Sequence, residues 1–318
     1  MKKQKSVLLM VALTSAMALM TTGCSLMGSD KVERAESVIE AYQTGDLDKF
    51  QSYVDDEDSI NYLIDAVEVS NADGMQEVYQ KVYELTKSAE VTVTATADDA
   101  SNEYATVTIE TVDIAGAFHE AMAVAAIEGG EAFADVPGWM MDALNGDLDT
   151  VEYEVQARTM SNGKLYDGFN DEFFSALTGG FYEYIPATMT TCTSTDGYDD
   201  KTYMLAVYDV VTASLDEYNF PFEGVEYTED EINAVIEEYT SVYAGYDGIE
   251  VGGKVEEDRL VIYMYIDYEV VDISDLEALD LVTSGYGSDI SLEVSIEGYE
   301  SDGFECETTD FGSGVLAD

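Results

Sequence analysis

Acidic residues are spread along the whole chain, and they limit how it can fold. The chain has 67 Asp and Glu against 13 Lys and Arg, for a formal net charge of −54. Residues 24–187 hold 34 acidic and 7 basic residues, and residues 188–318 hold 33 and 3. Because a carboxylate is costly to bury, we expect these residues to form a solvated acidic surface that keeps the protein soluble. A polyanion of this density repels phosphates, so we expect no nucleic-acid partner.

The chain still has enough apolar residues to form a core. Hydrophobic residues make up 46% of it and proline occurs only three times, which is a globular rather than a disordered composition. The length of 318 residues suggests two domains.

The N-terminus has the parts of an export signal. Lys2, Lys3 and Lys5 precede an uncharged apolar run over residues 7–20. That run is short for a bilayer span, so it is interpreted as the apolar region of a signal peptide. Small residues and Cys24 follow in the stretch TTGC.

This ending resembles the lipobox of bacterial lipoproteins, with Thr21 standing where an aliphatic residue is usual. The resemblance implies removal of residues 1–23 and lipidation of Cys24, with residues 24–30 as a tether. Ordinary cleavage after residues 16–18 is the alternative. We therefore expect a cell-membrane protein, held by acyl chains such as palmitate on the extracytoplasmic face.

Residues 31–187 are predicted to form an α+β domain in which helices cover an antiparallel sheet. Apolar spacing predicts helices over 32–42, 47–54, 60–67, 75–86, 114–128, 138–144 and 171–180. Alternation predicts strands over 91–97, 104–112 and 150–160, with a tight turn at 162–163.

Residues 188–309 are predicted to form a second α+β domain, followed by a tail at 310–318. We expect a strand over 202–211, a helix over 227–245 that begins with a capping box of Thr228 and Glu231, and a hairpin over 254–268. A short helix over 272–280 is expected to be capped by Ser274.

Two segments resemble known families. The stretch IEEYTSVYAGYDGIEVGGKVEEDRLVIYMYIDYEVVDISDLEAL, within about residues 190–308, is similar to the YehR-like bacterial lipoproteins. That resemblance implies a last helix ending at Gly303-Phe304, although residues 290–296 alternate as a strand would. VIEAYQTGDLDKFQSYV and FFSALTGG, within residues 30–187, resemble NTF2-like secreted lipoprotein domains. Neither resemblance supplies functional residues.

The motifs of common catalytic and metal sites are missing. The lone histidine, His119, cannot form a His-rich zinc motif, and it is interpreted as a helix-surface or packed residue. Residues 248–254 match G-x-x-x-x-G-K, but Val255 replaces the required Ser or Thr. We therefore expect no metal and no cofactor, and the catalytic residues, if any, are unknown. Cys192 and Cys306 could form a disulfide or stay reduced.

The sequence favours a lipid-anchored, non-catalytic module that binds an unknown ligand or envelope partner. A carboxylate-based hydrolase of envelope glycan or polymer is the alternative, and it would need two convergent carboxylates in a pocket. A solubilising spacer without a ligand is the third possibility.

Overall fold

The computed structural model describes residues 29–54, 74–94, 104–159, 164–165, 170–184, 188–195, 198–207, 209–222, 224, 227–256, 259–279, 281–282 and 290–311. The predictions for the signal and Cys24, for a helix near 60–67 and for a turn at 162–163 lie outside these residues. Within the described ranges, every helix is too short or too polar to cross a bilayer.

The first sheet has three antiparallel strands in the order β1-β2-β3. They are β1 (Glu90–Thr94), β2 (Tyr104–Val112) and β3 (Thr150–Arg158). Along β2, the alternate residues Ala105, Val107 and Ile109 are fully buried, because one face of the sheet packs on helices. The predicted strands are confirmed here.

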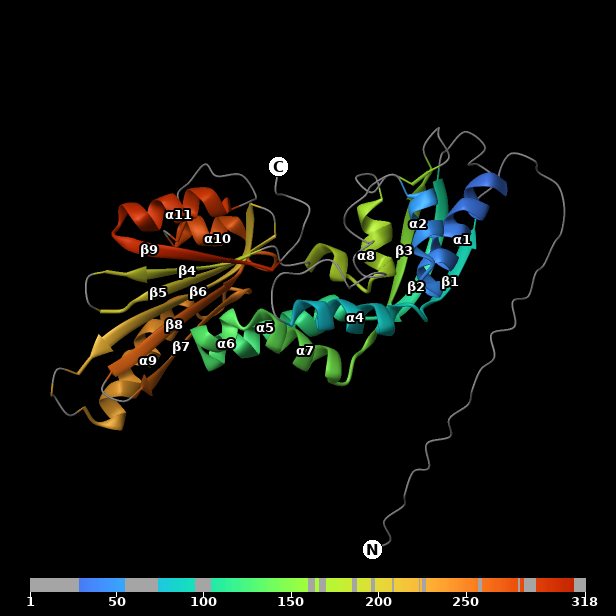
Figure 1. The fold of residues 1–318 in the computed structure, drawn as a ribbon. Coiled ribbons are helices and arrows are strands. Elements are labelled where there is room, and N and C mark those ends of the chain that lie inside the picture. Colours follow the sequence, from blue (N-terminus) through green and yellow to red (C-terminus); the bar gives the residue numbers. More distant parts are fainter. Residues whose placement is uncertain are drawn as a thin grey trace, which may run out of the picture.

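Helices pack against the apolar face of this sheet (Figure 1). They are α1 (Ser29–Thr44), α2 (Leu47–Tyr53), α4 (Met75–Thr86), α8 (Asp171–Leu177) and the 3-10 helix η3 (Phe181–Tyr184). The side chain of Asp46 accepts a hydrogen bond from the backbone N–H of Lys49 and so caps α2.

Three consecutive helices lie between the two sheets: α5 (Ile114–Glu128), α6 (Gly130–Ala134) and α7 (Val136–Asn145) (Figure 1). The helix predicted over 114–128 is confirmed as α5: the structure shows that Asp113 caps its start, and Gly129 ends it with a φ of 122°. Pro137 lies in the first turn of α7, where its missing N–H costs no helical hydrogen bond.

The second sheet has six antiparallel strands in the order β7-β8-β6-β5-β4-β9. Its strands are β4 (Thr188–Ser194), β5 (Lys201–Val207), β6 (Val210–Pro221), β7 (Ile249–Glu256), β8 (Arg259–Asp267) and β9 (Phe304–Asp310). The described residues thus confirm an α+β fold with two antiparallel sheets.

Both faces of this sheet are covered near its centre. Tyr203, Leu215 and Tyr265 belong to the large apolar cluster that continues into α5, α6 and the first sheet. Met264 and Ile266 face the other way, into a cluster with Leu276. Double coverage explains why β8 is almost continuously apolar instead of alternating.

Three helices accompany the second sheet: α9 (Glu229–Tyr243), α10 (Ile273–Ala278) and α11 (Leu292–Ser301). The capping box of Thr228 and Glu231 is confirmed. The predicted helix before Gly303 is also confirmed as α11, and Gly303 has a φ of 93°. The prediction that Ser274 caps α10 is wrong. The N-cap residue is Asp272, whose side chain accepts a hydrogen bond from the backbone N–H of Ser274.

The single strand predicted over 202–211 is wrong. β5 ends at Val207 and β6 begins at Val210, so the segment turns back on itself as a hairpin. Asp209 leaves the sheet at this turn, and its carboxylate accepts hydrogen bonds from Ser291 and the backbone N–H of Glu293 at the start of α11. That distant contact could not be read from the local pattern.

A disulfide joins the two strands at one side of the sheet. Cys192 of β4 lies directly opposite Cys306 of β9, with the two Cα atoms 4.0 Å apart. The bond closes a loop with a sequence separation of 114 residues. A closed loop of this length restricts the unfolded chain strongly.

We predict that breaking this bond lowers the free energy of unfolding by up to about 5 kcal/mol, as expected for a loop of roughly 100 residues. The measurement is denaturant unfolding with and without dithiothreitol, alongside a Cys192→Ala/Cys306→Ala variant. Dithiothreitol should destabilise the wild type and leave the variant unaffected. Free thiols at both positions in a non-reducing peptide map would contradict the pairing.

Candidate functional site

A polar cleft of about 530 Å³ lies where the α5–α6 junction meets one face of the six-stranded sheet. Residues 128–132 of the junction form one wall. The floor comes from the ends of β5, β6, β7 and β8, with Asp199 beside them. We call this feature the polar cleft.

The basic residues of the C-terminal half meet in this cleft. Residues 188–318 contain three Lys and Arg, and all three line it: Lys201 of β5, Lys254 of β7 and Arg259 of β8. In so acidic a chain, such convergence concentrates rare positive charge at one place. Sequence reasoning missed the cleft, although the scarcity of these residues was the available signal.

Five acidic residues also line the cleft, more than its three basic residues, and they offset the positive charge unevenly. The Lys254 ammonium pairs with Glu256 at 2.8 Å, whereas the Arg259 guanidinium is 3.9 Å from the Asp199 carboxylate. The Lys201 ammonium forms no ion pair with any residue in the described ranges. An incoming anion would therefore meet Lys201 with the least competition.

The wall of the cleft is fixed by polar contacts between helix and sheet. The Lys254 ammonium donates to the Glu128 carbonyl oxygen at 3.0 Å, and the Gly130 N–H donates to a Glu217 carboxylate oxygen at 2.9 Å. A Cβ on Gly130 would collide with the Tyr203 ring, so glycine allows this close approach. Burial and the neighbouring Glu217 hold the pKa of Tyr203 well above its usual value. Tyr203 therefore stays a neutral hydroxyl at the floor.

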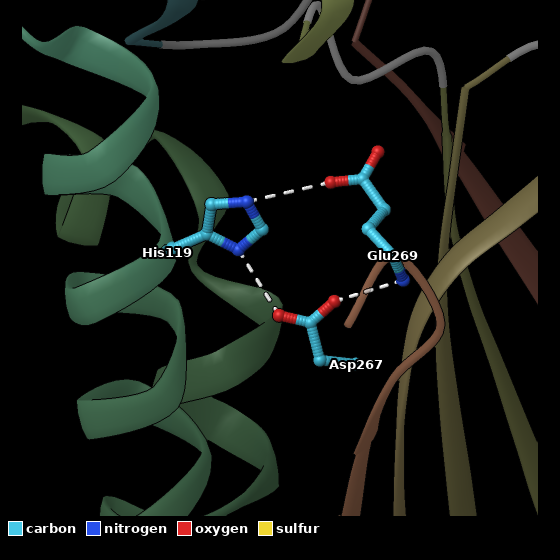
Figure 2. Close-up of side chains that lie close together, drawn as sticks. All are labelled: His119, Asp267 and Glu269. Carbon is cyan, nitrogen blue, oxygen red and sulfur yellow. Dashed lines mark hydrogen bonds and ion pairs between the residues drawn. The ribbon is translucent and has the colours of Figure 1, made fainter. Parts of the chain in front are cut away.

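A second polar cluster lies farther toward the start of α5 (Figure 2). His119 Nδ1 is 3.0 Å from Asp267 Oδ2 at the end of β8, and His119 Nε2 is 3.5 Å from Glu269 Oε2 in the following turn. Asp267 Oδ1 also accepts a hydrogen bond from the Glu269 backbone N–H at 3.0 Å. We call these three residues the His119 triad.

The His119 triad contains metal-binding residue types, and their ligand atoms lie within 4.8 Å of one another. Figure 2 shows, however, that each ring nitrogen faces a different carboxylate. An ion binds one ring nitrogen along its lone pair, so it could not engage both carboxylates through this ring orientation. The arrangement instead suits an imidazolium whose two N–H groups face two carboxylates. His119 is thus a half-buried contact residue.

The two buried carboxylates among the described residues lie on opposite faces of the sheet. Asp267 is directly opposite Ala213 on β6, whereas Asp216 lies three residues farther along β6 and so points to the other face. They therefore do not converge on one cavity. Of the remaining sequence motifs, Lys254 ends the G-x-x-x-x-G-K match within β7, and no helix follows it directly.

Asp216 is a buried acid with two hydroxyl partners. Thr202 Oγ1 donates to Asp216 Oδ1 at 2.5 Å, and the Tyr299 hydroxyl donates to the same oxygen at 3.4 Å. Both contacts favour the carboxylate, but burial has the larger effect and raises its pKa to about 6 from 3.8.

Comparisons with known proteins give no family for this chain. No known protein family matches the chain, and no curated protein matches it. A solved structure of the YehR protein of Escherichia coli is 18% identical, covers 38% of this chain and 90% of its own, and has a TM-score of 0.32. A solved structure of a protein from Streptococcus pneumoniae is 12% identical, covers 38% of this chain and 84% of its own, and has a TM-score of 0.27.

We predict that Asp216→Asn flattens part of the pH dependence of stability. Because its pKa is raised in the folded state, Asp216 contributes most to the free energy of unfolding below pH 3.8. This contribution is lost as the pH rises through about 6. The asparagine variant should gain up to about 3 kcal/mol over the wild type between pH 4 and pH 7. Urea unfolding of both proteins across this range gives the difference. Glu300→Gln, an exposed acid on α11, is the control. A difference that does not grow with pH would contradict the buried charge.

Proposed function

We propose that this protein is a lipid-anchored binding module on the extracytoplasmic face of the cell membrane, and that the polar cleft holds its ligand. The N-terminal sequence TTGC supports the anchor. The polar cleft supports binding. The YehR-like assignment of residues 190–308 and the NTF2-like assignment of residues 30–187 belong to the same proposal.

The observation that carries the binding function is the meeting of Lys201, Lys254 and Arg259 in one cleft. A ligand that suits them is small and polar, with at least one carboxylate or phosphate. The acidic residues and the Tyr203 and Asn219 side chains of the cleft would accept or donate hydrogen bonds to hydroxyl groups on the same ligand. An anionic sugar has both kinds of group.

The alternative, a hydrolase that uses a pair of carboxylates, has less support. Its mechanism needs two carboxylates about 5–10 Å apart on either side of the bond that is cleaved. Asp216 and Asp267, the buried acids of the described ranges, point to opposite faces of the second sheet. Of the carboxylates that line the polar cleft, Glu217 accepts a hydrogen bond from the Gly130 N–H and Glu256 pairs with Lys254. Binding without catalysis is therefore the better-supported proposal.

We predict that D-glucuronate or glucose 6-phosphate, but not glucose, raises the melting temperature of the protein in a saturable way. Lys201→Gln should weaken this binding about tenfold or more, because it removes a charge-assisted contact worth roughly 1.5–3 kcal/mol. Isothermal titration calorimetry measures the affinity. Lys81→Gln on α4 has the same charge change away from the cleft, and it should leave the affinity unchanged. Equal binding of glucose, or equal loss in both variants, would contradict the proposed cleft.

We predict that Cys24→Ala abolishes lipid attachment and releases the protein from the membrane fraction. The physical reason is that stable anchoring needs acyl chains, and the sulfur of Cys24 would carry them. Mass spectrometry of the mature N-terminus and membrane fractionation are the measurements. Ser25→Ala serves as the matched control and should stay membrane-bound. A Cys24→Ala protein that remains in the membrane fraction would refute the anchor.

A further inference from the structure

The His119 triad connects parts of the molecule that are far apart in the sequence. His119 lies on α5, and Asp267, which contacts it, is 148 residues away at the end of β8. The same helical layer also packs on the sheet through apolar contacts, such as the Phe133 and Tyr265 rings, whose centroids are 6.0 Å apart. The triad is thus a polar contact within a largely apolar interface.

The Asp267 carboxylate needs a partner at this place. Its side chain is 9% exposed, and a buried carboxylate without compensation is strongly unfavourable. The Glu269 backbone N–H donates a hydrogen bond to Oδ1, and His119 Nδ1 is hydrogen-bonded to Oδ2. The three Lys and Arg residues of the C-terminal half all line the polar cleft instead. Protonated His119 is the group placed to neutralise Asp267.

The second ring nitrogen adds to this arrangement. Glu269 Oε2 lies 3.5 Å from Nε2, and its side chain is 34% exposed. Two carboxylates therefore flank one imidazole from two sides, as Figure 2 shows. Only the protonated ring presents an N–H to each of them at once.

We propose that protonated His119 is an ionic latch that holds α5 against the end of β8, and that loss of its proton at rising pH loosens this contact. When the ring is neutral, Glu269 or Asp267 faces a nitrogen lone pair, and the charge of Asp267 is no longer compensated. The apolar contacts remain, so the loosening is local to the start of α5 rather than a separation of the two sheets.

The charged groups around His119 determine the direction in which its pKa is shifted. The hydrogen bond to Asp267 raises the pKa of His119 above 6.5, burial opposes this, and Glu269 and Asp113 add to the rise. The nearby side chains of α7, Trp139 and Met140, carry no charge. A raised pKa means that the stabilisation is complete below pH 6.5 and is lost as the pH rises through the folded-state value.

The first test measures the protonation of the His119 imidazole as a function of pH. Because the chain has one histidine, a carbon-13 histidine label gives a single imidazole signal in the NMR spectrum of the full chain in detergent. The pKa of His119 read from this titration should lie above 6.5 in the wild type and should fall in Asp267→Asn, which keeps the side-chain shape but removes the charge. Glu120→Gln, an exposed neighbour on α5 with the same charge change, should leave the midpoint unchanged. A wild-type midpoint at or below 6.5, or equal shifts in both variants, would overturn the latch.

The second test measures how firmly α5 is held against the end of β8. Amide hydrogen exchange of residues 114–128, corrected for the intrinsic effect of pH, should speed up as the His119 signal titrates in the wild type. His119→Gln should lose this pH dependence, and Glu269→Gln, a change at a more exposed side chain, should weaken it. The same pH dependence in His119→Gln would overturn the proposal. So would an equal loss of protection on adding EDTA at constant pH, since that result would mean a bound metal ion.

Discussion

The scarcity of positive charge is the constraint on which this structure depends. With 67 acidic and 13 basic residues, most carboxylates cannot find a cationic partner and must stay in water. The solution is a pair of antiparallel sheets whose apolar faces are covered by helices, with acidic residues on the outer surfaces. The few positive groups are therefore informative, because they lie where negative charge is compensated within the fold.

The helical segment α5–α6 is the element in which these positions meet. His119 near its start contacts the end of β8, and residues 128–130 at the helix junction contact Lys254 and Glu217 of the sheet. Between these points, the apolar residues of α5 join the large core cluster. One helical layer thus carries the His119 triad and also forms the wall of the polar cleft.

Local elements could be predicted from the sequence, and non-local pairing could not. The helix over 114–128 is marked at both ends by Asp113 and Gly129, so its bounds follow from neighbouring residues alone. β9 was not predicted, because it pairs with β4, about 114 residues away in the sequence. β4 was also missed, although it pairs on its other side with β5, the next strand in the chain. The same limit applies to the candidate site. His119 is visible as a lone histidine, but its contact with Asp267 arises only from the packing of α5 on the second sheet.

The position of β9 has a consequence for how the chain reaches its native state. Its strand partner, β4, was synthesised more than a hundred residues earlier and waits with an open edge until Phe304–Asp310 emerges. An unpaired edge can join other chains, and late long-range closure slows folding. A chaperone that shields strand edges, or a pathway that keeps the polypeptide extended until its last residues are made, would therefore benefit this protein most during biogenesis.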